Sequence, residues 1–451
     1  MRRHILRCVV MLQVCLVPLS WVRAAEASVA GRWEGAFVRL NSVQTVALDL
    51  VFEAGTVRGT FDIPDLGLSA EPLKDVAYEP PSLRFRLLYG QFRMHVQDDV
   101  AEMTGENPDW GPAVALHLKR VHREPALFRK EEIRFQNGAI SLAGTLVTPL
   151  ARAKHPAIVL VHGSGPQGRA DWHYRSLGDF FARHGIAALV YDKRGVGAST
   201  GDHEAATFDD LARDAASAVR FLAARKEIDR RRIGMLGSSQ GGWLAPLAAS
   251  RVGGVAFLIL DKGAAVGVRE QELQRVEYGL RAEKLSEAEI AEALGYTRQV
   301  FQVAYTGQGW PELQAATQEA RQKPWAKGVQ LAETEKDLEG WRLQRYDPAP
   351  VLRSTRIPVL ALFGGNDTLV PPDGNADMMR RYLEEAGNRD VTIRIFPELG
   401  HSRFLGQSLR GGRWEWPDGY WIWDKQSPAY LDTMISWLSE RLGAAAPRAG
   451  K

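Results

Sequence analysis

The hydrophobic pattern changes once along the chain. Between residues 29 and 123 apolar side chains alternate with small or polar ones, for example along 46–52, and turn residues separate the runs. A period of two predicts strands with one buried face, and no run of helical periodicity interrupts them. We therefore predict a small all-β domain over residues 25–125, an antiparallel barrel or sandwich. We interpret Trp33 and Trp110 as core or rim aromatics of this domain, with a ligand platform as the alternative.

From residue 126 onward short apolar runs alternate with stretches of helical periodicity. Such alternation predicts an α/β fold, a mainly parallel, doubly wound sheet with helices on both faces. Asn137 and Gly138 stand between two strand-like runs and predict a two-residue hairpin at the antiparallel start of this sheet. The predicted parallel strands are 156–161, 187–191, 232–236, 255–260, 357–363 and 391–396, and the predicted helices include 171–184, 208–226, 376–386 and 430–442.

Two segments of this second region, 126–451, depart from the alternation. Residues 268–347 are rich in Glu, Ala, Leu and Arg, which predicts a helical cap inserted after the sixth strand, with long helical stretches at 271–305 and 310–343. The cap would shape the substrate pocket, unless it is a solvated insertion without ligand contact. Residues 414–423 hold four tryptophans in ten positions. They could line a pocket or stack on a sugar, or they could pack against the cap or the β domain.

A glycine-rich pentapeptide, GSSQG at 237–241, follows the apolar run at 232–236 and precedes a helix-forming segment. This is the strand–turn–helix context of a nucleophile elbow, in which glycines permit a tight, strained turn. The turn would lift the Ser239 hydroxyl above the sheet and would place the Gln240 N–H where an oxyanion forms. A glycine-rich turn without chemistry is the alternative interpretation.

A serine nucleophile needs a base and an orienting acid from later strand ends. His401 follows the run at 391–396 and is the only histidine after Ser239, so it is the predicted base. Asp367 follows the strand-like run at 357–363 and is the predicted acid. Glu398 is a weaker candidate for the acid because it lies only three residues from His401, on the same loop.

A second oxyanion donor should come from the loop after an early strand. The sequence HGSGP at 162–166 follows such a strand, and we predict the Ser164 amide as the donor, with Gly163 as the alternative. His162 is interpreted as a brace of this loop rather than a catalytic residue. The segment YDKRGVGAS at 191–199 lacks the spacings of nucleotide-binding loops, so we predict a loop packed beside the elbow.

These five motifs resemble, in order and spacing, those of the α/β-hydrolase superfamily, over about residues 127–442. Within it, the chain is similar to bacterial carboxylesterases of the prolyl-oligopeptidase and dienelactone-hydrolase branch, several of which carry an N-terminal β domain. The resemblance implies a catalytic triad of Ser239, Asp367 and His401, with no metal and no organic cofactor. We expect a serine hydrolase that cleaves a small-molecule carboxylic ester through an acyl-enzyme. A serine peptidase or an acyltransferase with the same triad is the alternative, and a non-catalytic binding protein is a more distant one.

The N-terminal segment affects the net charge expected of the mature chain and its predicted cellular location. A basic start, an apolar run at 8–19 and small residues around Ala24 predict a secretory signal peptide over 1–24. Removing its four arginines from the 57 basic residues leaves 53 against 54 acidic ones, so nothing argues for nucleic-acid binding. Cys8 and Cys15 both lie in this leader, so the mature chain would have no disulfide. No other run has transmembrane length, and we predict a soluble, exported, periplasmic protein; a lipoprotein acylated at Cys15 is the lesser alternative.

Overall fold

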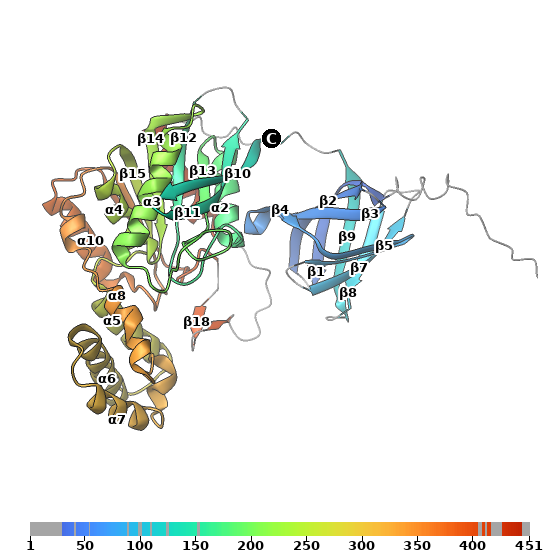
Figure 1. Cartoon of the computed structure of the whole chain (residues 1–451). Helices are drawn as coiled ribbons and strands as arrows, with labels where there is room; N and C mark the ends of the chain where they lie inside the picture. Colours follow the sequence, from blue (N-terminus) through green and yellow to red (C-terminus); the bar gives the residue numbers. More distant parts are fainter. Residues whose placement is uncertain are drawn as a thin grey trace, which may run out of the picture. The chain divides into compact units, whose positions relative to one another are not determined.

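The structure is a computed structural model, and its described residues form two compact units (Figure 1). The first unit comprises Met1–Pro64 and Ser69–Glu124, and the second comprises Asp65–Leu68 and Pro125–Lys451. The predicted signal peptide, Trp110 and residues 416–423 of the tryptophan-rich segment lie outside the described residues. The described residues are 29–39, 42–53, 55–87, 90–97, 102–108, 111–122, 126–150, 154–404, 408–410, 413–415 and 426–443.

The first unit is a nine-stranded antiparallel sheet in the order β4-β3-β2-β1-β9-β8-β7-β6-β5. Burial alternates along its strands, so that Phe92, Met94 and Val96 of β7 are buried while the residues between them are exposed. This confirms the predicted period of two. Trp33 is fully buried and donates its indole N–H to the carbonyl of Val29, as expected of a core aromatic. The strands are β1 Gly31–Arg39, β2 Ser42–Glu53, β3 Thr56–Ile63, β4 Leu68–Pro72, β5 Lys74–Glu79, β6 Ser82–Leu87, β7 Gly90–Gln97, β8 Glu102–Asn107 and β9 Gly111–Val121.

The second unit contains an eight-stranded sheet in the order β10-β11-β13-β12-β14-β15-β16-β17. The first two strands form the predicted antiparallel hairpin, in which Asn137 pairs with Ile140 and Gly138 has a φ of +59°. The strands from β12 to β17 are parallel to one another, which confirms the predicted α/β sheet. They are β10 Phe128–Asn137, β11 Ile140–Pro149, β12 His155–Val161, β13 Ala187–Tyr191, β14 Ile228–Ser238, β15 Val255–Asp261, β16 Val359–Gly364 and β17 Val391–Phe396.

Helices cover both faces of this sheet because successive strand residues point to opposite sides. Ile158 and Leu160 of β12 share a buried cluster with residues of α2 and α11, whereas Ala157 and Val159 share another with residues of α3, α4 and α10. The helices begin and end close to the predicted positions. They are α2 Trp172–Arg183, α3 Phe208–Ala223, α4 Gly241–Arg251, α9 Ala349–Leu352, α10 Pro372–Glu385 and α11 Pro428–Leu442.

A helical cap stands between β15 and β16, as predicted, and has a buried cluster of its own. Its long helices are shorter than expected. The first predicted stretch is divided at Lys284, which has a φ of +63°, and Ser286 then caps a new helix by accepting from the Glu289 N–H. Figure 1 shows α6 and α7 as a layer beyond α5 and α8. The cap consists of α5 Val268–Ala282, α6 Glu287–Thr306, α7 Trp310–Ala320, the 3-10 turns η2 Pro324–Gly328 and η3 Glu335–Leu338, and α8 Glu339–Leu343.

Two further observations complete the fold. Trp414, at the start of the tryptophan-rich segment, belongs to β19 Arg413–Glu415, which pairs with β18 Ser408–Arg410. None of the helices in the described ranges combines the length and apolar character required to cross a membrane.

Candidate active site

The turn between β14 and α4 has the strain expected of a nucleophile elbow. Ser239 has a φ of +53°, a left-handed conformation that costs energy for a residue with a side chain. A Cβ atom on Gly237 would lie 1.9 Å from the carbonyl oxygen of Gly241, and one on Gly241 would lie 2.3 Å from that of Val161. Both positions therefore require glycine, as predicted for a tight, strained turn between a strand and a helix.

Ser239, His401 and Asp367 form one hydrogen-bonded chain. The Ser239 Oγ lies 3.0 Å from His401 Nε2, and His401 Nδ1 lies 2.8 Å from Asp367 Oδ2. A carboxylate only accepts hydrogen bonds, so Nδ1 carries a proton and, in the neutral ring, Nε2 accepts the serine proton. This is the arrangement that activates a serine hydroxyl.

The fold brings these residues together because each follows a parallel strand at the same edge of the sheet. Asp367 comes after β16, and its side chain is buried. Its Oδ1 accepts from the backbone N–H groups of Leu369 and Val370, both at 2.9 Å, which fixes the carboxylate. Glu398, the weaker candidate for the acid, instead accepts from the Ser427 hydroxyl at 3.2 Å. Asp367 is therefore the carboxylate that His401 contacts.

Backbone N–H groups near Ser239 differ in their availability. The Gly163 N–H donates to the Tyr174 hydroxyl at 2.8 Å. The N–H groups of Ser164 and Gln240 have no acceptor among the residues that the structure describes. Ser164 is exposed, at the surface of its loop. Of the two amides considered for the second oxyanion donor, the structure leaves that of Ser164 free.

His162 is a buried support of the same loop. Its Nε2 lies 2.5 Å from the carbonyl oxygen of Tyr191, so Nε2 carries the proton that it donates. Burial and, to a smaller extent, the nearby Lys193 ammonium together lower the pKa of His162 to about 3. The ring stays neutral at physiological pH, and both its contacts and its protonation match a brace.

The loop 191–199 is folded by its own charged residues. Asp192 accepts from the backbone N–H groups of Arg169 and Ala198 with its two oxygens, each at 2.9 Å. Arg194 forms an ion pair with the buried Asp214 at 2.7 Å. These contacts are those of a packed structural loop, as predicted.

A buried charged pair under the elbow was not foreseen from the sequence. The Asp261 carbonyl accepts from the Ser239 N–H at 2.8 Å, and its carboxylate accepts from the Ser238 hydroxyl at 3.0 Å. Lys262 lies 2.6 Å from the other carboxylate oxygen. Burial alone would raise the pKa of Asp261, but the Lys262 charge and hydrogen bond lower it to about 2. The only signal in the sequence is a charged pair that directly ends an apolar run.

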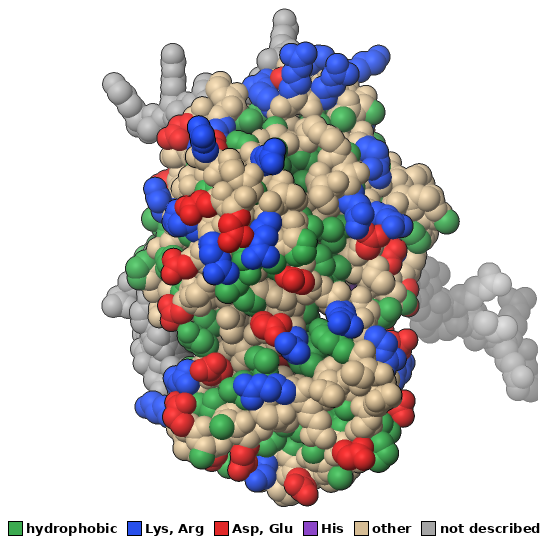
Figure 2. All heavy atoms as spheres, turned by 90° about the vertical axis from the view of Figure 1, so that its left-hand side faces the viewer, with side chains coloured by type: hydrophobic (Ala, Val, Ile, Leu, Met, Phe, Trp, Pro, Cys, Tyr) green, Lys and Arg blue, Asp and Glu red, His purple; other side chains and the backbone are tan. Residues whose placement is uncertain are grey.

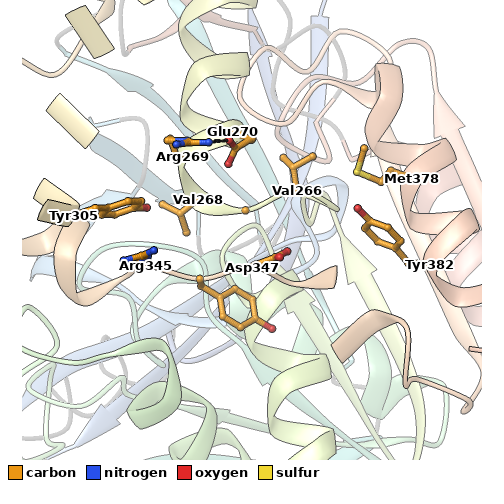
Figure 3. Close-up of a pocket in the computed structure, with 11 residues that line it drawn as sticks. Val266, Val268, Arg269, Glu270, Tyr305, Arg345, Asp347, Met378 and Tyr382 are labelled. Carbon is orange, nitrogen blue, oxygen red and sulfur yellow. Dashed lines mark hydrogen bonds and ion pairs between the residues drawn. The ribbon is translucent and has the colours of Figure 1, made fainter. Parts of the chain in front are cut away.

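A cavity of about 650 Å³ lies at the base of the cap, apart from the Ser239 site (Figure 3). Figure 3 shows Tyr305 and Arg345 on one side and Met378 and Tyr382 on the other. The Arg345 guanidinium stacks 4.8 Å above the Tyr305 ring. No residue of the hydrogen-bonded chain lines this cavity. Within the described ranges, no group of three or more His, Cys, Asp or Glu side chains could hold a metal ion.

The fold and this site define a serine hydrolase of the α/β-hydrolase superfamily. The chain belongs to the family described as serine aminopeptidase, S33, whose model matches residues 152–407. It is 25% identical over 292 residues to the esterase EstD of Thermotoga maritima, an alignment that covers 63% of this chain and 62% of that protein. The chain thus matches less than two thirds of that relative's length.

Solved structures show a more distant likeness. Acetyl xylan esterase 1 from Thermoanaerobacterium sp. is 16% identical, with a TM-score of 0.43, over 71% of this chain and 86% of that one. The acylaminoacyl peptidase of Pyrococcus horikoshii is 17% identical, with a TM-score of 0.43, over 84% of this chain and 53% of that one.

Proposed function

We propose that this protein is an exported serine esterase that hydrolyses carboxylic esters with a triad of Ser239, His401 and Asp367. The observation that carries the proposal is the hydrogen-bonded chain from the Ser239 hydroxyl to the Asp367 carboxylate at a strained elbow. The relative described as an esterase supports an ester substrate over an amide.

The geometry supports a two-step acyl transfer. His401 Nε2 takes the proton of the Ser239 hydroxyl as Oγ attacks the carbonyl carbon, and the carbonyl oxygen becomes an oxyanion. The free N–H groups of Gln240 and Ser164 stabilise that charge. His401 then gives the proton to the alkoxide that leaves as the alcohol. Water, activated by His401, attacks the acyl-enzyme by the same route and releases the acid.

Asp367 contributes through His401. Its carboxylate keeps the proton on Nδ1, which leaves Nε2 free to accept, and it stabilises the imidazolium that forms in each step. Its two bonds from the backbone amides of Leu369 and Val370 hold it in place while the imidazole changes charge.

A serine aminopeptidase is the second candidate, because the family model carries that description. Such an enzyme would use the same acyl transfer on a peptide and would have to bind a free amino terminus. Hydrolysis of aminoacyl p-nitroanilides at rates above those of short p-nitrophenyl esters would favour it.

The decisive experiment compares the wild-type protein with Ser239→Ala, using a fluorophosphonate probe and p-nitrophenyl acetate. We expect labelling and turnover in the wild type, no labelling of the variant, and a loss of about 10⁶ in kcat. Ser250→Ala is the matched control, because Ser250 is exposed on the same α4 and its hydroxyl donates to the Leu247 carbonyl, one turn before it. A folded wild-type protein that is neither labelled nor active would refute the proposal.

Export is part of the proposal and rests on the predicted leader at 1–24. Expression in a bacterium followed by cell fractionation should yield a periplasmic protein whose sequence begins at Ala25. A chain that keeps Met1 and stays in the cytoplasm would remove export from the proposal and would leave the esterase activity untouched.

A further inference from the structure

Lys193 places a buried ammonium directly against the oxyanion loop. The residue follows β13 in the loop 191–199, and 4% of its surface is exposed. Its Nζ lies 2.6 Å from the carbonyl oxygen of Gly163 and 2.8 Å from that of Gly165. These two carbonyls belong to the residues on either side of Ser164, whose N–H is the free amide of this loop.

The same ammonium reaches the other predicted oxyanion donor. Nζ lies 3.4 Å from Oε1 of Gln240, whose backbone N–H is the second free amide. An ammonium only donates, so the amide oxygen of Gln240 must face Lys193. Its Nε2 then donates to Oε1 of Gln344, at the end of the cap, at 2.9 Å. One cation therefore contacts the two residues that flank Ser164 and the side chain of Gln240.

The contact with Gly163 determines where the Ser164 N–H points. The carbonyl of Gly163 and the N–H of Ser164 belong to one peptide unit, and in a planar trans peptide they point in opposite directions. A peptide next to glycine rotates easily, since glycine tolerates many backbone conformations. Holding the Gly163 oxygen against Lys193 opposes this rotation and keeps the Ser164 N–H on the opposite side of the peptide from that oxygen.

The Lys193 ammonium donates to the carbonyls of Gly163 and Gly165 rather than to a carboxylate. Within the part of the chain that the structure describes, no carboxylate forms an ion pair with Lys193. A buried charge without a counterion is costly to desolvate, so the backbone carbonyls are what offset that cost. The titratable groups that face it are Asp171, which favours the charged form, the neutral His162, and Tyr174, which bonds the Gly163 N–H.

We propose that Lys193 is a positioning residue of the oxyanion hole: it locks the Gly163–Ser164 peptide in the orientation that donates to the oxyanion and ties it to Gln240. The inference rests on the proposed esterase function. It predicts an effect on the chemical step and not on ground-state binding, because the oxyanion exists only after attack.

The test compares Lys193→Met with Lys130→Met, using p-nitrophenyl acetate and a trifluoromethyl ketone whose serine adduct bears an oxyanion. Lys130 pairs with the buried Asp179 at 2.9 Å, away from the Ser239–His401–Asp367 hydrogen bonds, so it controls for the loss of a partly buried lysine. We expect Lys193→Met to lower kcat about 10- to 100-fold and to lower the affinity for the ketone by the same factor. This loss is no larger than the loss in kcat expected when a whole oxyanion donor is removed. KM should stay near the wild-type value, and Lys130→Met should keep wild-type kcat.

A second measurement needs no variant. Burial lowers the pKa of Lys193 to about 8, and its charged form holds the loop. The wild-type kcat should therefore fall as pH rises through about 8, with KM unchanged, whereas Lys193→Met should lack this fall. Lys193→Arg, which keeps a cation in the fold, should recover part of the kcat lost in Lys193→Met.

The outcomes separate the two proposals. Wild-type kcat and ketone affinity in a folded Lys193→Met would overturn the positioning role and leave the esterase standing. If Lys193→Met does not fold, a wild-type kcat that stays constant from pH 7 to pH 9.5 would overturn the role instead. A wild-type protein without any activity would overturn the proposed function and this inference with it.

Discussion

The carboxyl edge of the sheet and the helical cap are held by different kinds of polar contact. At the sheet edge, His401 bonds residues 34 and 162 positions away. In the cap, Arg281 pairs with Glu277 one turn before it and with Glu287 just after the turn. The face in Figure 2 shows acidic and basic side chains interspersed toward its lower end, where Figure 1 draws α6 and α7. The ion pairs of this cap arginine are local in the sequence, whereas the site joins residues that follow strands far apart in the sequence.

The space around glycines also differs between the sheet edge and the cap helices. A Cβ on Gly237 or Gly241 would overlap backbone atoms of the elbow, but one on Gly279 of α5 or Gly295 of α6 would meet nothing within 4 Å. Residues at the sheet edge are therefore fixed by their neighbours, while the cap helices leave room for change. The cap contacts the site through Gln344, whose Oε1 accepts from the Gln240 side chain, and through Gln271, which donates to the Leu369 carbonyl.

The largest effect that we expect from a substitution chosen to test this comparison is that of Asp367→Asn. An amide at this position can donate to Nδ1 and so favours the wrong tautomer of His401, and we expect kcat for p-nitrophenyl acetate to fall about 10⁴-fold. The matched change in the cap, Asp337→Asn, removes only a charge that accepts from the Thr334 N–H, and it should leave kcat unchanged. Near-normal turnover of Asp367→Asn would assign the acid role to another carboxylate, with Glu398 the first to test.

The candidate site residues that the sequence predicts stand at the ends of apolar runs. Ser239, Asp367 and His401 each follow a strand whose hydrophobic pattern is unmistakable, and parallel strands bring their carboxyl ends to one edge. The elbow glycines were predictable for the same reason, because a tight strand-to-helix turn has few solutions.

The same reasoning missed the buried cations. Lys193 stands between Asp192 and Arg194, and Lys262 between Asp261 and Gly263. Such polar surroundings are typical of exposed lysines, and only the packing of distant loops shows that these two are buried. The break in the first cap stretch could have been found, since Ser286 and Glu289 have the spacing of a capping box. Helical composition on both sides of it outweighed that local signal.

The next effect in size is that of a methyl group at the elbow. Gly237→Ala would force its Cβ against the Gly241 carbonyl, so β14 or α4 must shift. We expect a loss of about 3 kcal/mol in the free energy of unfolding, the upper end of the cost of about 1–3 kcal/mol that overpacking typically has. Thermal unfolding would measure the loss of stability as a lower Tm. The rate of fluorophosphonate labelling should also decrease, because the shift displaces Ser239. A variant that unfolds and labels like the wild type would show that the turn can relax.

The smallest effect should have the opposite sign. Gly295 is exposed inside α6 with open space around it, so Gly295→Ala should stabilise the helix by about 0.5–1 kcal/mol. For a protein of this size that corresponds to a rise of about 1–2 °C in Tm, with kcat unchanged. Gly279→Ala in α5 provides a second substitution of the same kind. If either variant gained Tm but lost kcat, then the mobility of the cap helices would contribute to turnover. The contrast between a fixed site and a tolerant cap would then hold for stability alone, because turnover would also depend on the conformational freedom of the cap.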